Sequence, residues 1–321
     1  MPDFSPTDYA IPGFVLLVLI EMVWARRLRR DAYEPRDTLT SLAFGLGSTV
    51  AGVFTAGLVF AAFLWVWQFR LFDVPMELPG AWWAWALCFV LDDLAYYWVH
   101  RFGHRVRWFW ASHVNHHSSQ HYNLSTALRQ TWTGFFTLLF VLKLPLILVG
   151  FHPVMIAICG GFNLIYQFWI HTEAIGRMPR WFEALMNTPS HHRVHHATNP
   201  RYLDRNYAGV FIVWDKLFGT FEPELHPEEG GERIRYGIVR QLGTFNLFWS
   251  VFHEWFAMFQ DMFRAPWRHK LSYLLREPGW SHDGSRETSG MIRARWQERQ
   301  DARARQSVAT ENPIAEPREA A

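Results

Sequence analysis

Histidine is frequent in this chain, and half of its copies fall in three short clusters. The chain has 16 histidines among 321 residues. The clusters have the forms HxxxH, HxxHH and HxxHH, and their members are His100 and His104; His113, His116 and His117; and His192, His195 and His196. On an α-helix, residues at positions i, i+3 and i+4 share one face. Each cluster can therefore direct two or three imidazoles at a single point.

Imidazoles gathered in this way are typical of a transition-metal site, because neutral imidazole binds iron, zinc and copper well. His171, at the end of an apolar stretch, is a ninth candidate ligand. Eight or nine imidazoles are too many for one ion and suit two. A shell almost without carboxylates leaves the metal charge poorly neutralised, which favours anionic bridging ligands. This predicts O₂ activation at a pair of iron ions, although spacing alone does not identify the metal.

The remaining histidines are expected to be structural. His191 lies outside the HxxHH frame and stands between the two classes. Six others are expected to be surface or hydrogen-bonded core residues: His121, His152, His226, His253, His269 and His282.

A polar stripe precedes the first cluster. Asp93, Tyr97, His100 and His104 follow one another at helical spacing, so they share one face. A carboxylate inside an apolar segment is costly unless it is paired or functional. We expect Asp93, or Asp92 in its place, to accept a hydrogen bond from a ligating imidazole and so fix its tautomer. The alternative is a structural bond to a neighbouring tyrosine or arginine.

A second polar stripe precedes His171. Asn163, Gln167 and His171 stand at positions i, i+4 and i+8 of an otherwise apolar segment. We expect them to face the metal cavity, and polar helix–helix packing is the alternative.

Five apolar stretches are predicted to cross a membrane, and they cover residues 9–25, 38–69, 81–99, 131–150 and 154–170. Half of all residues are hydrophobic, with 18 Trp and 27 Phe, which suits a protein with much membrane interface. Cys88 and Cys159 lie in apolar runs and are expected to be buried as small hydrophobes rather than joined in a disulfide framework. The net charge of +2 gives no indication of a nucleic-acid partner.

Charge placement predicts the orientation of these spans. Asp3 and Asp8 precede the first stretch, whereas Arg26 and Arg27 open an arginine-rich loop after it. A signal peptide would carry positive charge before its apolar run. Positive loops stay in the cytoplasm, and the spans then deliver His100 and His171 to the same side. We expect the metal site to face the cytoplasm, at the inner membrane of a bacterium or the endoplasmic reticulum of a eukaryote.

The predicted fold is therefore an all-α integral membrane protein, with about five transmembrane helices and a cytoplasmic helical cap that carries the two-metal site. We divide the chain into N-terminal membrane helices (1–79), a catalytic domain (80–283) and a tail (284–321). The tail is expected to be disordered or loosely helical. The aromatic, amphipathic segment 245–263 is expected to lie on the membrane surface.

The three boxes resemble those of the fatty acid hydroxylase superfamily, which includes sterol desaturases. Longer strings resemble the alkylglycerol monooxygenases of that superfamily: HHSSQHYNLSTALRQ (116–130), FNLIYQFWIHTE (162–173) and NTPSHHRVHHATNPRYLDRNYAGVFIVWDKLFGTFEPE (187–224). The similarity covers roughly residues 80–283. It implies a non-haem monooxygenase with two iron ions, O₂ as co-substrate and tetrahydrobiopterin as reductant. It places the nine histidines as metal ligands and identifies no residue for the pterin.

One position departs from the pattern that the resemblance implies. The family often has glutamate directly after the second histidine of the first box, where this chain has Arg105. Glu173 or Asp204 is a candidate substitute for that acid. The resemblance also implies that the substrate is an alkylglycerol, hydroxylated at its ether-linked carbon. The departure bears on the pterin and on this ether-lipid substrate, and leaves metal binding intact.

The predicted partners are a membrane lipid substrate and an electron donor that the sequence does not identify. The rival enzyme class is a sterol or fatty-acyl hydroxylase or desaturase, because the same site serves both. The rival outside enzymes is a membrane metal carrier or haem-binding protein. A carrier would distribute ligands through the bilayer, and a haem needs only one or two axial ligands.

Overall fold

The protein is all-helical in the part that the structure describes, a computed structural model covering residues 6–28 and 31–311, where it contains no strand. This confirms the all-α part of the predicted fold class. The longer helices are α1 (Pro6–Arg27), α2 (Pro35–Trp67), α3 (Trp82–Arg105), α4 (Arg107–His117), α6 (Pro153–Trp169), α10 (Leu247–Arg264) and α12 (Ser289–Glu311). The shorter α-helices are α5 (Leu144–Val149), α7 (Arg180–Leu185), α8 (Pro189–His195), α9 (Val213–Leu217) and α11 (Ser272–Leu275). Five 3₁₀ turns complete the set: η1 (Leu124–Leu128), η2 (Gly134–Thr137), η3 (Leu139–Lys143), η4 (Pro227–Glu229) and η5 (Trp267–His269).

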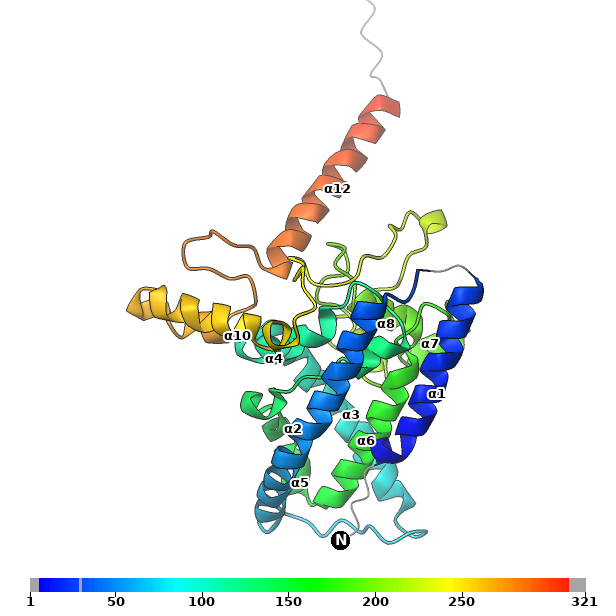
Figure 1. The fold of residues 1–321 in the computed structure, drawn as a ribbon, viewed down its shortest axis with the longest axis vertical. Helices are drawn as coiled ribbons and strands as arrows, with labels where there is room; N and C mark the ends of the chain where they lie inside the picture. The colour runs from blue at the N-terminus through cyan, green and yellow to red at the C-terminus, as the bar shows by residue number, and fades with distance from the viewer. Residues whose placement is uncertain (1–5, 29–30, 312–321) are drawn as a thin grey trace, which may run out of the picture.

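Helices α1, α2 and α6 run side by side along one axis, and α10 lies across it (Figure 1). Helices α4, α7 and α8 gather at one end, whereas the short helix α5 lies toward the other (Figure 1). Helix α6 packs against α1 and α3, while α4 packs against α3 and α10. At the gathered end lie α4 and α8, which carry two of the histidine boxes (Figure 1).

Helices α1 and α2 are long and apolar enough to cross a membrane. The 33 residues of α2 extend roughly 50 Å, compared with about 30 Å for the hydrocarbon core of a bilayer. Their outward faces are apolar yet open: Val53 is 76% exposed and Phe54 72% exposed. A soluble protein rarely exposes an apolar surface of this extent. These two helices are therefore candidate membrane helices.

Residues 131–150 do not form the single spanning helix that we predicted. They are divided among η2, η3 and α5, and Leu138 between the first two has a left-handed φ of 57°. Hydroxyl groups compete here with helical hydrogen bonds: Thr137 Oγ1 donates to the Gly134 carbonyl at 2.6 Å and accepts from Leu139 N at 3.3 Å. The longest helical run, Leu139–Val149, extends roughly 16 Å, about half the thickness of the hydrocarbon core.

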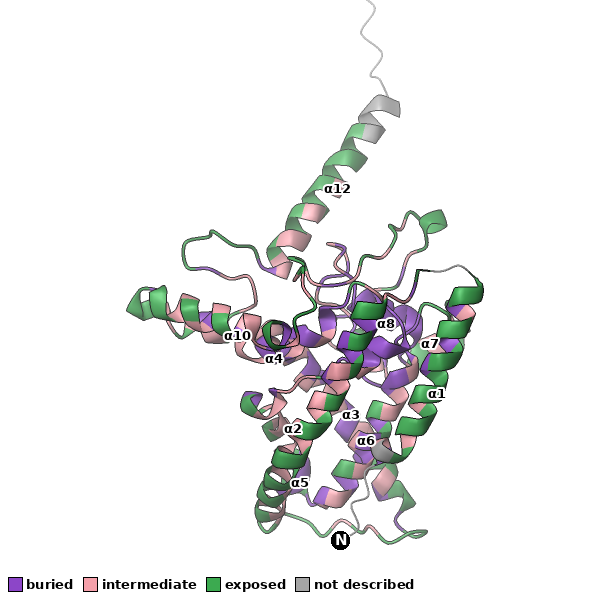
Figure 2. Cartoon of the chain, viewed as in Figure 1, coloured by how far each residue is buried: buried purple, intermediate pink, exposed green. Residues whose placement is uncertain are grey.

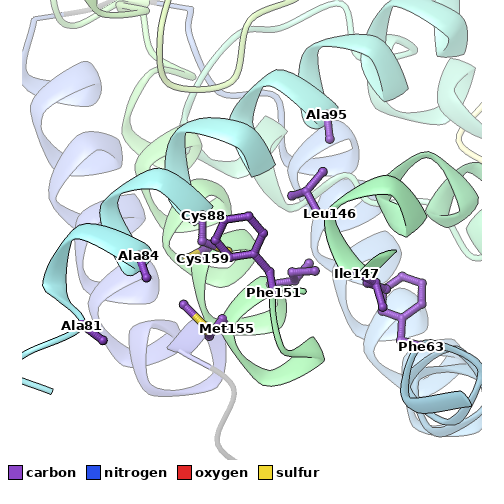
Figure 3. Close-up of a cluster of buried hydrophobic side chains, with 11 residues drawn as sticks. Phe63, Ala81, Ala84, Cys88, Ala95, Leu146, Ile147, Phe151, Met155 and Cys159 are labelled. Carbon is purple, nitrogen blue, oxygen red and sulfur yellow. The ribbon is translucent and has the colours of Figure 1, made fainter. Parts of the chain in front are cut away.

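An apolar core fills the space between α3, α5 and α6. Cys88 of α3 lies against Cys159 of α6, with Met155 and Phe151 beside them (Figure 3). Both cysteines are free and buried, as the sequence predicted. Phe63 of α2 completes this cluster from the side of α5 (Figure 3).

Burial is distributed unevenly along the molecule. Buried residues are concentrated around α4 and α8, whereas α1 and α2 present mostly exposed residues outward (Figure 2). Many of the buried side chains at this end are polar or charged, including Asn123, Arg129, Asn187 and Asp215, each with at most 1% exposure. Buried polar groups require hydrogen-bond partners. Side-chain hydrogen bonds therefore organise this end of the fold.

Glu21, the one acid within the apolar run of α1, joins α1 to this polar end. It is 6% exposed and accepts hydrogen bonds from Tyr33 Oη at 2.5 Å, from Leu124 N at 2.8 Å and from the Thr172 hydroxyl. Thr172 directly follows His171. The C-terminal end of α1, with Arg26 and Arg27, therefore lies at the end of the molecule where the histidines gather.

The two long helices α10 and α12 lie in the C-terminal part of the chain. Helix α10 is amphipathic: Val251, Trp255 and Met258 are buried, whereas Phe256 and Phe263 are exposed. The tail was predicted to be either disordered or loosely helical. Its residues Ser289–Glu311 form the helix α12. Helix α12 projects away from the helical body (Figure 1). Residues 312–321 lie outside the described residues.

Candidate metal centre

The nine histidines predicted as ligands come together in two groups. Within each group, one potential ligand atom from each histidine lies within 4.8 Å of those of the others. The first group is His100, His104, His113, His117 and His195, and the second is His116, His171, His192 and His196. The groups adjoin, because the rings of His117 and His196 stack with centroids 4.4 Å apart. This division into five and four is the arrangement expected for two neighbouring ions.

Four short segments place these side chains. Helix α3 ends with the first box, α4 ends with the second, and His171 follows α6. The third box lies on α8, which begins after the cap residue Thr188 with Pro189 in its first turn. Between α3 and α4 the chain is extended at Val106, with φ −126° and ψ 121°. This sharp change of direction turns the first two boxes toward each other.

Backbone carbonyls fix the tautomer of at least four imidazoles. His100 Nδ1 lies 2.8 Å from the Tyr207 carbonyl and His195 Nδ1 lies 2.9 Å from that of Arg205. In the second group, Nδ1 atoms lie near carbonyl oxygens at 2.7 Å for His171 and 3.3 Å for His116. A carbonyl only accepts, so Nδ1 carries the proton in each neutral ring and Nε2 carries a lone pair. Ligating histidines are commonly oriented in this way.

The lone pairs converge at distances that suit a shared cation. His171 Nε2 lies 3.2 Å from His116 Nε2 and 3.0 Å from His192 Nε2. The first two atoms both lack a proton and cannot hydrogen-bond each other. Two nitrogens each about 2.1 Å from a common ion, at roughly 90°, stand about 3.0 Å apart. The residues therefore fit a first-row metal ion, which removes the repulsion between the facing lone pairs.

The protonation states also suit metal binding. Burial lowers the pKa of His100 to about 3 and that of His116 to about 4. Burial likewise holds the pKa of every other histidine in the two groups well below its ordinary value. Neutral imidazole, the form that binds metals, is therefore the form present at neutral pH.

Residues 85–220, which contain all nine histidines, match the sequence model of the fatty acid hydroxylase family. This stretch is therefore similar to that family. Over 283 residues the chain is 39% identical to an alkylglycerol monooxygenase of Homo sapiens, a match that covers 87% of this chain and 60% of that protein. The chain therefore spans less than two thirds of the length of this curated relative.

More distant relatives of the chain act on sterols, by their names. A cholesterol 25-hydroxylase of Homo sapiens is 28% identical over 142 residues, covering 41% of this chain and 49% of that protein. A Delta(7)-sterol 5(6)-desaturase of Gibberella zeae is 25% identical over 180 residues, covering 47% of this chain and 48% of that protein. No solved structure has significant similarity to the chain.

Within the matched stretch, Asp93 does not bond to an imidazole, contrary to our expectation. Its Oδ1 accepts from Asn163 Nδ2 at 2.7 Å and from Val210 N at 2.8 Å. Its Oδ2 accepts from Phe211 N at 3.0 Å and from Trp214 Nε1 at 2.9 Å. These four donors satisfy a carboxylate that is fully buried. Asp93 thus holds the segment after Tyr207 against α3, and acts on the imidazoles only through the backbone.

The side chains of the second polar stripe make polar helix–helix contacts, the alternative that we gave. Gln167 Nε2 donates to Asn163 Oδ1 at 2.6 Å, and Asn163 in turn donates to Asp93. The backbone carbonyl of Gln167 is the one that orients His171. The stripe therefore connects α3 to the second histidine group by a chain of hydrogen bonds.

Tyr97 of the first stripe and Asp92, the alternative to Asp93, also make no contact with an imidazole ligand in the hydrogen bonds and ion pairs of the described residues. Tyr97 Oη lies 2.8 Å from Thr220 Oγ1 and accepts from Arg101 Nη1 at 3.1 Å. Asp92 forms an ion pair with Lys143 Nζ at 2.7 Å. Tyr97 thus has the arginine contact that we gave as the alternative, whereas Asp92 pairs with a lysine.

The seven remaining histidines lie outside both groups. His191 is buried, and its ring faces Phe221 with centroids 5.4 Å apart. The six predicted as structural are also absent from the groups: His121, His152, His226, His253, His269 and His282. His152, for example, caps α6 by accepting from Val154 N at 3.1 Å.

The two acids considered as substitutes differ in position. Asp204 Oδ1 lies 3.5 Å from His104 Nδ1, and Asp204 Oδ2 lies 3.7 Å from Arg105 Nη1. Arg105 also pairs with Glu277. Glu173 accepts from Tyr236 Oη at 3.0 Å and is exposed. Asp204 is therefore the acid beside the first histidine group.

Sequence patterns did not identify the loop that carries the orienting carbonyls of Arg205 and Tyr207. Asp215 holds this loop, accepting from Tyr207 N and Ala208 N at 2.8 Å each. Burial raises the pKa of Asp215 to about 6. Asp204 and Asn206 each have a φ of 55°. Since aspartate and asparagine tolerate this left-handed conformation better than other side chains, their spacing was the one available signal.

Proposed function

We propose that this chain is a membrane-bound lipid monooxygenase that uses two iron ions and O₂. The observation that carries the proposal is the convergence of neutral imidazole nitrogens in two adjoining groups. The proposal is supported by the similarity of the chain to proteins named as a lipid monooxygenase and a sterol hydroxylase. The reaction inserts one oxygen atom into a C–H bond, and the second leaves as water with two electrons and two protons from a donor. Iron held by the two groups would supply O₂ binding and the electron transfers.

The residues of the chain supply position and a dry enclosure. The carbonyls of Arg205, Tyr207 and Gln167 keep the Nε2 lone pairs aimed inward, so the donor set is formed before a metal binds. The chain of hydrogen bonds from Gln167 through Asn163 to Asp93 keeps α3 and α6 in register. Positioning selects the carbon that reacts, because a rigid site presents one bond at reacting distance.

We propose that the site faces the cytoplasm of a membrane crossed by five segments. The end of α1 with Arg26 and Arg27 is joined to the histidine end through Glu21 and Thr172. Positive residues at a helix end favour the cytoplasmic side. Helices α3 and α6 cross beside α1 and α2. We propose that the broken segment 131–150 crosses as well, with η3 packed against α3 and α5 packed against α2.

The substrate that we propose is an alkylglycerol, oxidised at the ether-linked carbon. The hemiacetal so formed collapses to an aldehyde and glycerol. Tetrahydrobiopterin is the proposed electron donor. We propose that Asp204 serves in place of the glutamate that the family often has at the position of Arg105. Similarity to a sterol hydroxylase and a sterol desaturase, together with Arg105, supports the second candidate, oxidation of a sterol or fatty-acyl chain.

Product analysis separates these candidates. Protein purified in detergent and loaded with Fe²⁺ without O₂ is incubated with 1-O-hexadecylglycerol, with and without tetrahydrobiopterin. We expect about two iron ions per chain, no Soret absorption and O₂-dependent release of hexadecanal. A hydroxylated or desaturated lipid in place of the aldehyde identifies the second candidate. Fewer than one iron ion per chain after loading contradicts the proposal as a whole.

A further inference from the structure

A cavity of about 280 Å³ opens behind the second histidine box. Three separate parts of the chain line it: the first turn of α2 at Asp37, the stretch from Ser118 to Arg129, and the loop 242–245 that precedes α10. None of the nine candidate ligands lines it. It is therefore distinct from the space between the two histidine groups.

A buried ion pair is part of the cavity wall. Arg129 is 1% exposed and Asp37 is 3% exposed, and Arg129 Nη1 donates to Asp37 Oδ1 at 3.0 Å. The opposite charges of these two side chains cancel. An ionic guest would lose its hydration without gaining an uncompensated counter-charge. The wall therefore suits an uncharged guest that both donates and accepts hydrogen bonds.

Arg129 keeps hydrogen-bonding capacity for such a guest. Its Nε donates to the Asn115 carbonyl and to Ser118 Oγ, both at 3.1 Å. Its Nη1 donates to Asp37 and to Ser41 Oγ. Within the described residues, the hydrogen bonds of Arg129 involve only Nε and Nη1, so Nη2 is available to donate to a guest. Gln120 and Thr244 add an amide and a hydroxyl to the lining.

The same wall is connected to the proposed ligands. Ser118 directly follows His117, a member of the first histidine group. The carbonyl of Arg129 accepts from Nδ1 of His116, a member of the second group, at 3.3 Å. A guest in the cavity thus lies on the outer side of the segment that supplies ligands to both groups.

The size of the cavity limits what it can hold. Its volume corresponds to about nine water molecules, which is below the range typical of drug-sized ligands. Leu242 and Phe245 give it one apolar side. A head group or a small heterocycle fits these limits, whereas a lipid chain or a protein partner does not.

We propose that this cavity is a binding site for a small, uncharged group rich in hydrogen-bond donors and acceptors. Two sources share that chemistry: the glycerol head group of the lipid substrate and the small water-soluble electron donor. The proposal rests on the proposed function, because that reaction supplies both molecules.

Filling the cavity tests the proposal. Thr244→Trp places a large side chain in its lining. Val239→Trp is the matched control, at an exposed position outside the lining and shortly before the loop 242–245. The KM values for 1-O-hexadecylglycerol and for tetrahydrobiopterin are measured on iron-loaded full-length protein. We expect Thr244→Trp to raise one of the two KM values about tenfold, equivalent to the loss of one or two hydrogen bonds, and Val239→Trp to raise neither. The KM that rises identifies the source.

Unchanged KM values for both molecules in Thr244→Trp overturn the proposal. If that variant fails to load iron, Gln120→Ala decides, because it removes only an exposed amide from the lining. We expect Gln120→Ala to raise the same KM about threefold, and no change contradicts the proposal.

A separate measurement distinguishes failure of the site from failure of the proposed function. If the wild type forms no product from alkylglycerol, the proposed function fails. Calorimetric titration of wild type and Thr244→Trp with tetrahydrobiopterin, and with short-chain 1-O-hexylglycerol, then tests the cavity alone. Weaker binding of one probe by the variant supports the site, and equal binding of both contradicts it.

Discussion

The molecule buries two regions of opposite chemistry. Between α3, α5 and α6, the apolar core around Cys88 and Met155 is held by packing (Figure 3). At the other end, nine imidazoles lie in two groups whose facing lone pairs repel. Packing alone accounts for the first region, whereas we propose that a bound cation stabilises the second. The difference shows that half of this fold serves as a scaffold that keeps the other half in a costly arrangement.

Among the changes that test the difference between the two regions, removal of one imidazole is expected to have the largest effect on iron content and turnover. His192→Ala removes a nitrogen that lies 3.0 Å from His171 Nε2 and 3.2 Å from His196 Nε2. We expect loss of one iron ion and a fall in turnover of more than about 100-fold, since second-shell changes alone cost about 10–100-fold. Assays of iron content and product formation measure both. His191→Ala, its buried neighbour outside the groups, should keep its iron, and equal losses in the two variants would refute the assignment.

Metal removal should destabilise the polar region and spare the apolar one. Because a bound ion stabilises only the folded state, iron present at about 1,000 times its dissociation constant adds about 4 kcal/mol. Thermal unfolding in detergent, with and without a chelator, measures this contribution. We expect a lower midpoint after chelation, restored by Fe²⁺. A midpoint that chelation leaves unchanged would mean that the histidines bind no ion.

Asp93→Asn tests whether the two regions are coupled. The substitution keeps the shape but weakens the acceptance of hydrogen bonds from Val210 N, Phe211 N and Trp214 Nε1. Charge-assisted bonds contribute about 1.5–3 kcal/mol each, so we expect a loss of about 3 kcal/mol in unfolding free energy. Iron affinity should also fall about tenfold, because the same segment positions the Tyr207 carbonyl. Loss of stability with unchanged iron affinity would show that Asp93 acts on the fold alone.

Met155→Ala should affect only the apolar region, and by the smallest amount. Met155 is fully buried, and truncation of such a side chain costs about 2–5 kcal/mol. We place this variant at the lower end, about 2 kcal/mol, because methionine is flexible and its neighbours can fill part of the space. Thermal unfolding measures the cost and iron analysis serves as the second readout. A loss of iron here would contradict the separation of the two regions.

In the polar region, the sequence predicted the clustered histidines better than it predicted the residues that position them. The nine histidines that come together in the two groups were all named from the sequence, eight by their helical spacing and His171 by its place at the end of an apolar stretch. The carbonyls of Arg205 and Tyr207 were not, because every residue has a carbonyl and an irregular segment has no periodicity. Asp93 was singled out correctly but given the wrong partner, since sequence spacing relates it to its own helix and not to the distant segment 210–214.

The apolar regions show a different limit. Composition indicated α1 and α2 as long apolar helices, and both formed. It indicated 131–150 equally well, although Thr137 and the left-handed Leu138 interrupt that helix. Hydrophobicity reports that a segment is buried or faces lipid, whereas its continuity depends on local hydrogen bonds that composition does not record.

Anomalous X-ray scattering at the iron absorption edge, from crystals of the iron-loaded protein, tests the central claim most directly. The account predicts two peaks. One should lie among the Nε2 atoms of the first histidine group, and the other among His116, His171, His192 and His196. A single peak, or peaks away from these nitrogens, would contradict it.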